Sequence, residues 1–214
     1  MSDLILPSSF DLKESQSYKK VYTEGIYNRI NFNKSHVAVD VGANMGILSN
    51  FLKDKVGKLI GIEPCQDNIP FLKANCPTIV LHPYGAWDQE DEVEFYSYFA
   101  PGLSGVGHFA GWDAVFPAEP TVSKLKVLPL DIILKDEPMI DFINMDIEGS
   151  ELKALVGAKK IILKYKPLLA ISTYHRYDDK FRIPEYIFSL VPEYKMINVG
   201  SHEVATSLFF CKGG

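Results

Sequence analysis

Short apolar runs rich in β-branched residues recur along the chain, separated by stretches with helical periodicity. Such runs are typical of buried parallel strands, and we predict them over residues 37–41, 58–62, 78–81, 140–145 and 167–172. Between them, apolar residues recur every three or four positions and predict helices over about 46–52, 67–75, 150–156 and 183–190. This alternation indicates a mostly parallel sheet with helices on both faces.

The two ends of the chain depart from this alternation. Residues 1–14 form an irregular lead-in, and residues 15–30 have an apolar stripe at helical spacing that predicts one helix. At the other end, residues 194–199 and 204–211 predict a closing hairpin that adds an antiparallel edge strand. We expect a single domain over 1–214, with the lead-in and helix in 1–34 and the core in 35–211.

The middle of the chain carries a long loop. Strand-like alternation at 93–99 and 122–128 flanks residues 100–120, which are rich in glycine, proline and aromatic residues and show no periodicity. Loops of this length in compact domains are commonly functional. We interpret 100–120 as a lid or a wall on the acceptor side, with Phe109, Trp112 and Phe116 as its apolar residues and His108 on its surface.

Chemistry enters after the first predicted strand, where Gly42 and Gly46 flank Asn44 before a helix begins. Glycine permits a sharp turn and the close approach of a ligand. A strand, a glycine loop and a helix N-terminus together build a crevice at the carboxyl end of the strand. This arrangement favours a nucleotide-like ligand.

Two acids narrow the choice of ligand. Asp40 precedes the loop, where its charge disfavours a phosphate and favours a ligand with an ammonium and a sulfonium. Glu63, at the end of the next strand, is placed to accept hydrogen bonds from both ribose hydroxyls. The pair indicates S-adenosyl-L-methionine, and the predicted cofactor-binding residues of these two segments are Asp40, Gly42, Ala43, Asn44, Gly46, Glu63 and Pro64.

A third strand end is expected to lie near the adenine. It carries the segment Tyr84-Gly85-Ala86-Trp87-Asp88. We expect the backbone groups of Ala86 and Trp87 to contact the adenine edge and Asp88 its amino group, with a plain core role as the alternative for Trp87.

Composition adds limits to this interpretation. The net charge of −5 provides no basic field for nucleic acid. The three cysteines have no metal or disulfide spacing and fit a reducing cytoplasm. We find no signal-peptide pattern and no run of about 18 apolar residues, so we expect no stable membrane insertion. Whether the chain forms a homo-oligomer stays open.

Four segments in this order resemble the FkbM family of S-adenosylmethionine-dependent methyltransferases. They are residues 39–46 (VDVGANMG), 62–64 (IEP), 127–131 (VLPLD) and 146–151 (DIEGSE). Pro129 stands where threonine is commoner in that family. The resemblance implies a Rossmann-like class I methyltransferase fold with a mostly parallel seven-stranded sheet and an antiparallel C-terminal hairpin. It also implies O-methylation of a small-molecule hydroxyl on a sugar, glycan or natural product.

Candidate catalytic residues follow the fourth and fifth core strands. In this fold Asp146 faces the transferred methyl group and is suited to orient the donor's amino group. His175, with an ordinary pKa near 6.5, is our predicted general base, oriented by Asp146 or Glu148. For Glu151, in the first turn of a helix, we expect a structural role favoured by the helix dipole.

Other interpretations stay open. Asp146, Glu148 and His175 also form a mixed oxygen–nitrogen set for Mg²⁺ or Mn²⁺, although no tight spacing requires a metal and we predict none. A nicotinamide-dependent oxidoreductase is a second possibility, but it calls for three loop glycines where two occur. A non-catalytic nucleotide-binding domain is a third.

Overall fold

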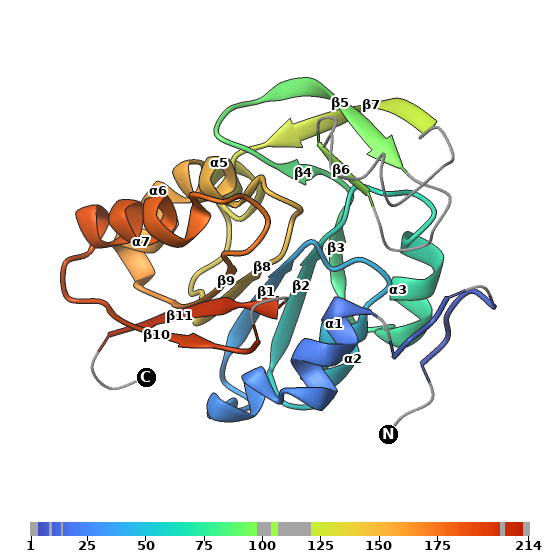
Figure 1. Cartoon of the computed structure of the whole chain (residues 1–214), viewed down its shortest axis with the longest axis horizontal. Helices are drawn as coiled ribbons and strands as arrows, with labels where there is room; N and C mark the ends of the chain where they lie inside the picture. Colours follow the sequence, from blue (N-terminus) through green and yellow to red (C-terminus); the bar gives the residue numbers. More distant parts are fainter. Residues whose placement is uncertain are drawn as a thin grey trace.

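The computed structural model of the chain describes residues 4–8, 10–13, 15–97, 104–106, 121–201 and 204–211. Seven strands form one sheet in the order β10-β11-β9-β8-β1-β2-β3 (Figure 1). The strands are β1 (Val37–Val41), β2 (Lys58–Ile62), β3 (Val80–His82), β8 (Phe142–Met145), β9 (Leu168–Ser172), β10 (Lys195–Val199) and β11 (Thr206–Phe210). The pairs among the first five are parallel, and β11 runs antiparallel to both of its neighbours. The predicted fold is confirmed.

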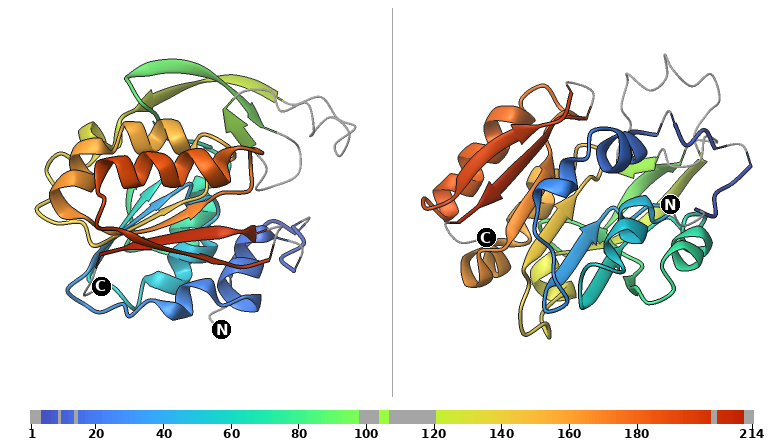
Figure 2. Two further views of the ribbon diagram at one scale, coloured as in Figure 1. Left: turned by 60° about the vertical axis from the view of Figure 1, so that its left-hand side comes forward. Right: turned by 90° about the horizontal axis from the view of Figure 1, so that it is seen from below.

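Alternate residues of the strands face two apolar clusters, as the period of a strand requires. Val39 and Val41 join the cluster beneath α4–α7, whereas Ala38 joins the cluster beneath α2. Helices therefore cover both faces of the sheet (Figure 2). Their bounds are α2 (Ile47–Leu52), α3 (Ile69–Asn75), α4 (Leu130–Ile133), α5 (Glu151–Val156), α6 (Lys159–Tyr165) and α7 (Asp179–Leu190).

A second, four-stranded sheet has the order β4-β7-β5-β6. Its strands are β4 (Gly85–Ala86), β5 (Asp91–Ser97), β6 (Ser104–Val106) and β7 (Thr121–Leu128). Phe95, Leu125 and Val127 pack with Cys65 in an apolar cluster of their own. This sheet follows the carboxyl end of β3 in the chain and places an apolar surface above it.

The N-terminal helix differs from its prediction. Residues 15–30 divide into α1 (Gln16–Tyr18), a π-helical turn η1 (Lys19–Thr23) and a 3₁₀ turn η2 (Ile26–Arg29). Gly25, with φ of 60°, interrupts the helix because this left-handed conformation cannot continue a right-handed one. An apolar stripe reports which face is buried, and it does not report such a break.

Other elements also differ from their prediction, and strands β4 and β6 were not foreseen. Helix α6 was not foreseen, and the antiparallel strand β11 lies between β9 and β10 instead of at the sheet edge, which β10 occupies. Strand order follows from tertiary packing, because a hairpin pattern is the same in either orientation. Within residues 100–120, interpreted as a lid or wall with His108, the structure describes only Ser104–Val106, which are not loop as expected but form strand β6, paired with β5; the rest of that interpretation lies outside the described residues. Among the described residues, no helix has the length and apolar character needed to cross a bilayer.

Candidate functional site

The glycine loop after β1 is a tight turn with three left-handed residues. Gly42, Asn44 and Gly46 have φ of 82°, 51° and 86°. The N–H groups of Gly42 and Ala43 donate to the carbonyl of Ile62, at 2.9 and 3.2 Å. A Cβ on Gly42 would lie 2.2 Å from the Asp146 carbonyl oxygen. Gly42 is therefore required by the close approach of β1, β2 and β8 at their carboxyl ends.

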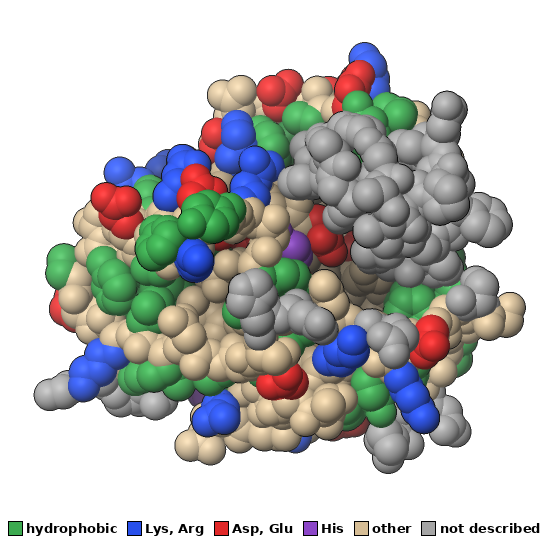
Figure 3. Space-filling model, in the orientation of Figure 1, with side chains coloured by type: hydrophobic (Ala, Val, Ile, Leu, Met, Phe, Trp, Pro, Cys, Tyr) green, Lys and Arg blue, Asp and Glu red, His purple; other side chains and the backbone are tan. Residues whose placement is uncertain are grey.

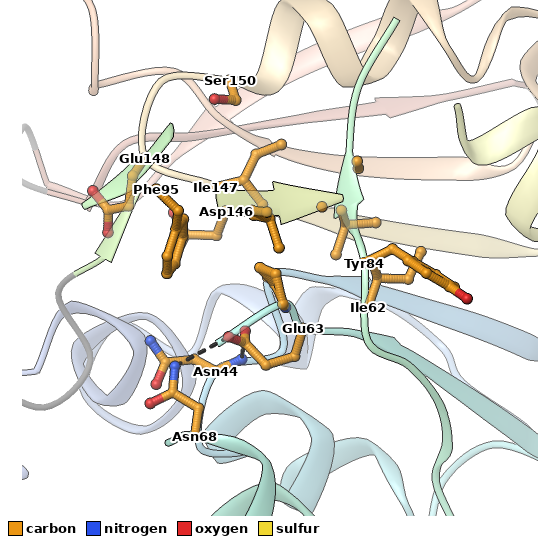
Figure 4. A pocket seen from close by; sticks show the side chains of 16 residues that line it. Asn44, Ile62, Glu63, Asn68, Tyr84, Phe95, Asp146, Ile147, Glu148 and Ser150 are labelled. Carbon is orange, nitrogen blue, oxygen red and sulfur yellow. Dashed lines mark hydrogen bonds between the residues drawn. The ribbon is translucent and has the colours of Figure 1, made fainter. Parts of the chain in front are cut away.

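Glu63 is buried at the end of β2 and holds the loop in place. Its Oε2 accepts from the Asn44 N–H at 2.7 Å, and its Oε1 accepts from the Cys65 N–H and the Asn68 amide (Figure 4). Burial raises the pKa of Glu63, and these three donors oppose the rise. Oε2 has one donor among the described residues, which leaves it acceptor capacity toward the cleft.

An open cleft lies beside these residues. Its walls come from the ends of β1, β2 and β8 and from the small sheet, and Figure 4 shows Glu63, Phe95 and Glu148 around it. The space-filling view shows this face hollowed, with histidine and acidic side chains inside (Figure 3). The lining residues are Val41, Gly42, Asn44, Ile62, Glu63, Pro64, Asn68, Tyr84, Gly85, Ala86, Phe95, Leu125, Asp146, Ile147, Glu148 and Ser150.

Trp87 does not line this cleft. Its N–H donates to the carbonyl of Leu128 at 3.0 Å, and its ring lies beneath the Lys153 ammonium, 4.4 Å from the ring centroid. Of the backbone groups expected at the adenine edge, the Trp87 N–H is therefore not available, because the hydrogen bond to Leu128 already uses it. Ala86 lines the cleft as expected, and Asp88 pairs with Lys153 at 3.2 Å.

A smaller cavity adjoins the cleft and shares Gly42, Asn44 and Asp146 with it. Asp40 lines this cavity as a buried carboxylate. Its oxygens accept from Ser49 Oγ at 2.7 Å and from the Asn144 amide at 3.0 Å. Burial raises the pKa of Asp40 to about 6. The two cavities meet at Gly42, Asn44 and Asp146, and the smaller one is lined by the charged side chains of Lys20, Asp40 and Asp146.

Asp146, directly after β8, is held by residues from three parts of the chain. Lys20 Nζ lies 2.8 Å from Oδ2, while Ser172 Oγ and Tyr174 Oη donate to Oδ1 at 2.7 and 3.2 Å. Burial raises the pKa of Asp146, but the Lys20 ammonium and His175 outweigh it and hold that pKa well below its usual range. Asp146 is therefore a fixed anion at the junction of the two cavities.

His175, after β9, lies among three carboxylates. Its Nδ1 is 2.8 Å from Glu151 Oε1, and its Nε2 is 3.3 Å from Glu148 Oε2 and 3.6 Å from Asp146 Oδ1. Burial lowers the pKa of His175, but Glu151, Glu148 and Asp146 raise it to about 9. The assumption of an ordinary imidazole pKa near 6.5 was therefore wrong, because carboxylates surround the ring.

Glu148 lines the cleft in an unusual backbone conformation. Its φ of 54° is left-handed, which is uncommon for a residue other than glycine and occurs often at functional sites. Burial raises the pKa of Glu148 to about 7. The structure thus brings Asp146, Glu148 and His175 together, as the sequence predicted. The pKa of Asp146 is lowered and that of Glu148 is raised.

Three site residues escaped the sequence analysis, and a fourth was assigned another role. Lys20, Ser172 and Tyr174 bind Asp146, yet none has a local signal; a lysine in the run Tyr18-Lys19-Lys20-Val21 normally faces water. Glu151 lies in the first helical turn as expected, but its carboxylate also accepts from the Ile147 N–H and contacts His175.

A metal set among the described residues differs from the one the sequence suggested. Ligand atoms of Asp146, Glu151 and His175 lie within 4.8 Å of one another, with Glu151 in place of Glu148. The Lys20 ammonium is already at Asp146, and His175 Nδ1 is at Glu151 Oε1. Local cations therefore balance these carboxylates, and we assign the set no metal role.

Comparison with known proteins agrees with this geometry. Residues 40–196 match the family described as Methyltransferase FkbM domain, and no curated protein matches the chain. The methyltransferase FkbM from Methylobacillus flagellatus KT is 29% identical, with a TM-score of 0.64 over 92% of this chain and 48% of that chain. This chain therefore spans about half the length of that protein.

Two more distant structures share the fold. An rRNA methylase from Streptococcus thermophilus is 12% identical, with a TM-score of 0.53 over 88% of this chain and 93% of that chain. The Streptococcus mutans protein SMU.1697c, in complex with SAH (S-adenosylhomocysteine), is 12% identical, with a TM-score of 0.50 over 87% and 93%. The cleft that Glu63 lines and the smaller cavity that Asp40 lines meet at Gly42, Asn44 and Asp146. The chain belongs to the FkbM methyltransferase family.

Proposed function

We propose that this protein methylates a hydroxyl oxygen of a small polyhydroxylated molecule, such as a sugar, a glycan or a natural product. The observation that supports this most is the position of Glu148. Its carboxylate lines the cleft beside the junction of the two cavities and lies 3.3 Å from His175 Nε2. A hydroxyl acceptor needs such a proton acceptor next to the methyl donor.

The donor would lie across the cleft and the smaller cavity. Glu63 Oε2 would accept from a ribose hydroxyl, and Ala86, Phe95 and Leu125 would provide the apolar surface for the adenine. Asp40 and Asp146, which line the smaller cavity, would offer negative charge to the ammonium of the methionine part. Gly42 and Gly46 let the loop turn beside this part of the donor, because both have a left-handed φ and a Cβ at either would meet protein atoms, the Asp146 carbonyl oxygen at Gly42 and Leu72 at Gly46.

S-adenosylmethionine, when bound, supplies a methyl group activated by its sulfonium. Glu148 would accept the proton of the acceptor hydroxyl as that oxygen takes the methyl group, and would then return the proton to water. His175, as an imidazolium, offers positive charge to the oxygen and stabilises the ionised form of Glu148.

This assignment reverses the roles that the sequence suggested for His175 and Glu148. A positioned general base typically contributes about 10²–10⁴-fold in rate. Alignment of the acceptor with the donor contributes about 7 kcal/mol or more in favourable cases. In this assignment Asp146 orients groups at the junction of the two cavities, His175 supplies positive charge, and Glu148 accepts the proton.

An assay of SAH formation tests the proposal. Sugars and glycosides with free hydroxyls are compared with amine and thiol acceptors of similar size. We expect turnover with hydroxyl acceptors only, at least 100-fold lower in Glu148→Gln, and unchanged in Glu185→Gln, which alters an exposed acid of α7. Turnover of amines or thiols alone would contradict O-methylation, and a fully active Glu148→Gln would remove its assigned role.

Two other expectations belong to this proposal. The acidic net charge argues for a small-molecule acceptor over nucleic acid, and the free thiols of Cys65, Cys76 and Cys211 agree with a reducing cytoplasm. The oxidoreductase alternative gives way to the methyltransferase family. A non-catalytic domain would not need Asp146 and Glu148 in the cleft.

A further inference from the structure

The N-terminal segment, residues 16–29, reaches both acids of the smaller cavity. Lys20 contacts Asp146, and Tyr27 Oη donates to Asn144 Oδ1 at 2.9 Å, whose amide in turn donates to Asp40. Lys20 and Tyr27 also line this cavity. The segment precedes residue 40, where the family match begins, so family resemblance assigns it nothing.

Lys20 is the most unusual residue of this segment. Its side chain is 1% exposed, although a buried ammonium is costly unless it is paired and hydrogen-bonded. All three of its donors have partners: Asp146 Oδ2 at 2.8 Å, Ser172 Oγ at 2.7 Å and Tyr174 Oη at 3.3 Å. Asp146 follows β8, Ser172 is the last residue of β9, and Tyr174 lies shortly after it. One lysine therefore joins the N-terminal segment to two strand ends.

The backbone around Lys20 has an unusual helical conformation. Lys20 lies in η1, where the Glu24 N–H donates to the Lys19 carbonyl at 2.7 Å in a π-helical turn. Such turns are rare and frequently occur at functional sites. Figure 1 shows α1 beside α2, so the segment lies on the side of the sheet where the glycine loop leads into α2.

We propose that Lys20 is a positioning residue of the donor site, which fixes the orientation of Asp146 at the junction of the two cavities. The inference rests on the proposed donor placement. Lys20 has no donor left for the ligand and acts through Asp146. With Oδ2 held by Lys20, Oδ1 faces Ser172, Tyr174 and His175, and the N-terminal segment forms the wall of the cavity for the amino-acid end of the donor.

Calorimetric titration of SAH tests this with a double-mutant cycle of Lys20→Met and Asp146→Asn. Lys13→Met, which alters an exposed lysine of the lead-in, is the control and should bind like the wild type. We expect Lys20→Met to weaken SAH binding at least tenfold. In the Asp146→Asn background, the same change should cost no further affinity, because the group through which Lys20 acts has lost its charge.

The outcomes separate the inference from the function on which it rests. If the wild type does not bind SAH, the donor placement fails. If the wild type binds and Lys20→Met binds equally well, or if the two substitutions weaken binding additively, Lys20 has no positioning role. Thermal unfolding of each variant shows whether it is folded. If Lys20→Met alone does not fold, the double variant decides, since it leaves neither charge unpaired. A tenfold loss of SAH affinity in the double variant relative to Asp146→Asn would overturn the inference.

Discussion

His175 Nδ1 and Glu151 Oε1 lie 2.8 Å apart, in side chains that are 7% and 0% exposed. A buried carboxylate this close favours the protonated ring. Together with Glu148 and Asp146 it raises the pKa of His175 to about 9, although burial alone would lower it. The residue that the sequence offered as a base is thereby held as an acid at neutral pH.

We expect the Glu151→Gln variant to lower the pKa of His175 by removing the nearest negative charge. Titration of the ring by NMR spectroscopy measures this directly, with Glu185→Gln as a control that leaves it unchanged. A wild-type His175 that titrates near 6.5 would show that the carboxylates do not hold its proton.

Methyl transfer should follow a bell-shaped pH profile. The rate rises as pH increases through about 7, because Glu148 must be ionised to accept a proton. It falls above about pH 9, where His175 loses the proton that supports Glu148 and the acceptor oxygen. Steady-state rates with a saturating acceptor test this. Glu148→Gln should lack the rise through pH 7, and a rise that persists would assign it to another group.

Asp146 should make stability depend on pH in acid. Its folded pKa lies below its unfolded value near 3.9, so its contribution is present above that value and is lost as pH falls below it. At neutral pH, Asp146→Asn should cost about 3 kcal/mol because Lys20 stays buried without its anion. Urea unfolding at neutral and acidic pH should show the gap between wild type and variant narrowing in acid. A constant gap would contradict the assignment.

Gly42→Ala should abolish SAH binding and destabilise the fold. The added Cβ would meet the Asp146 carbonyl oxygen, and a left-handed φ costs a side chain about 1–2 kcal/mol. Gly200→Ala is the matched control, because it shares the positive φ but follows β10 and lines neither the cleft nor the smaller cavity. We expect that variant to lose stability while keeping SAH affinity, as monitored by differential scanning fluorimetry with and without SAH. Equal loss of binding in both would point to a general folding defect.

Glu63 should matter for both binding and stability. Glu63→Ala removes the proposed ribose contact and leaves the Asn44 N–H, the Cys65 N–H and the Asn68 amide without their acceptor. We expect at least a tenfold loss of SAH affinity and a loss of about 1–3 kcal/mol for each donor left buried and unpaired. Equilibrium dialysis and denaturant unfolding separate the two effects. SAH affinity equal to the wild type would move the donor elsewhere.

The sequence by itself determined the alternation of strands and helices, the glycine loop and the acid at the end of β2. These features are local: strand burial follows from runs such as Val37–Val41, and the turn after Asp40 follows from two glycines four residues apart. The same locality explains the errors. A stripe of apolar residues does not report the break at Gly25, and the pattern of a hairpin does not report which strand lies at the edge.

Only the tertiary structure decided the chemistry of the candidate site. Lys20, Asp146 and Ser172 are far apart in the sequence, and their contacts depend on where η1, β8 and β9 lie in space. The pKa of His175 likewise depends on three carboxylates that the β8–α5 turn brings to it. Electrostatic interactions act through space and strengthen with burial, whereas a sequence pattern records only neighbours along the chain. The sequence was therefore enough to predict the acids and the histidine as site residues, whereas the fold determines which of them is protonated.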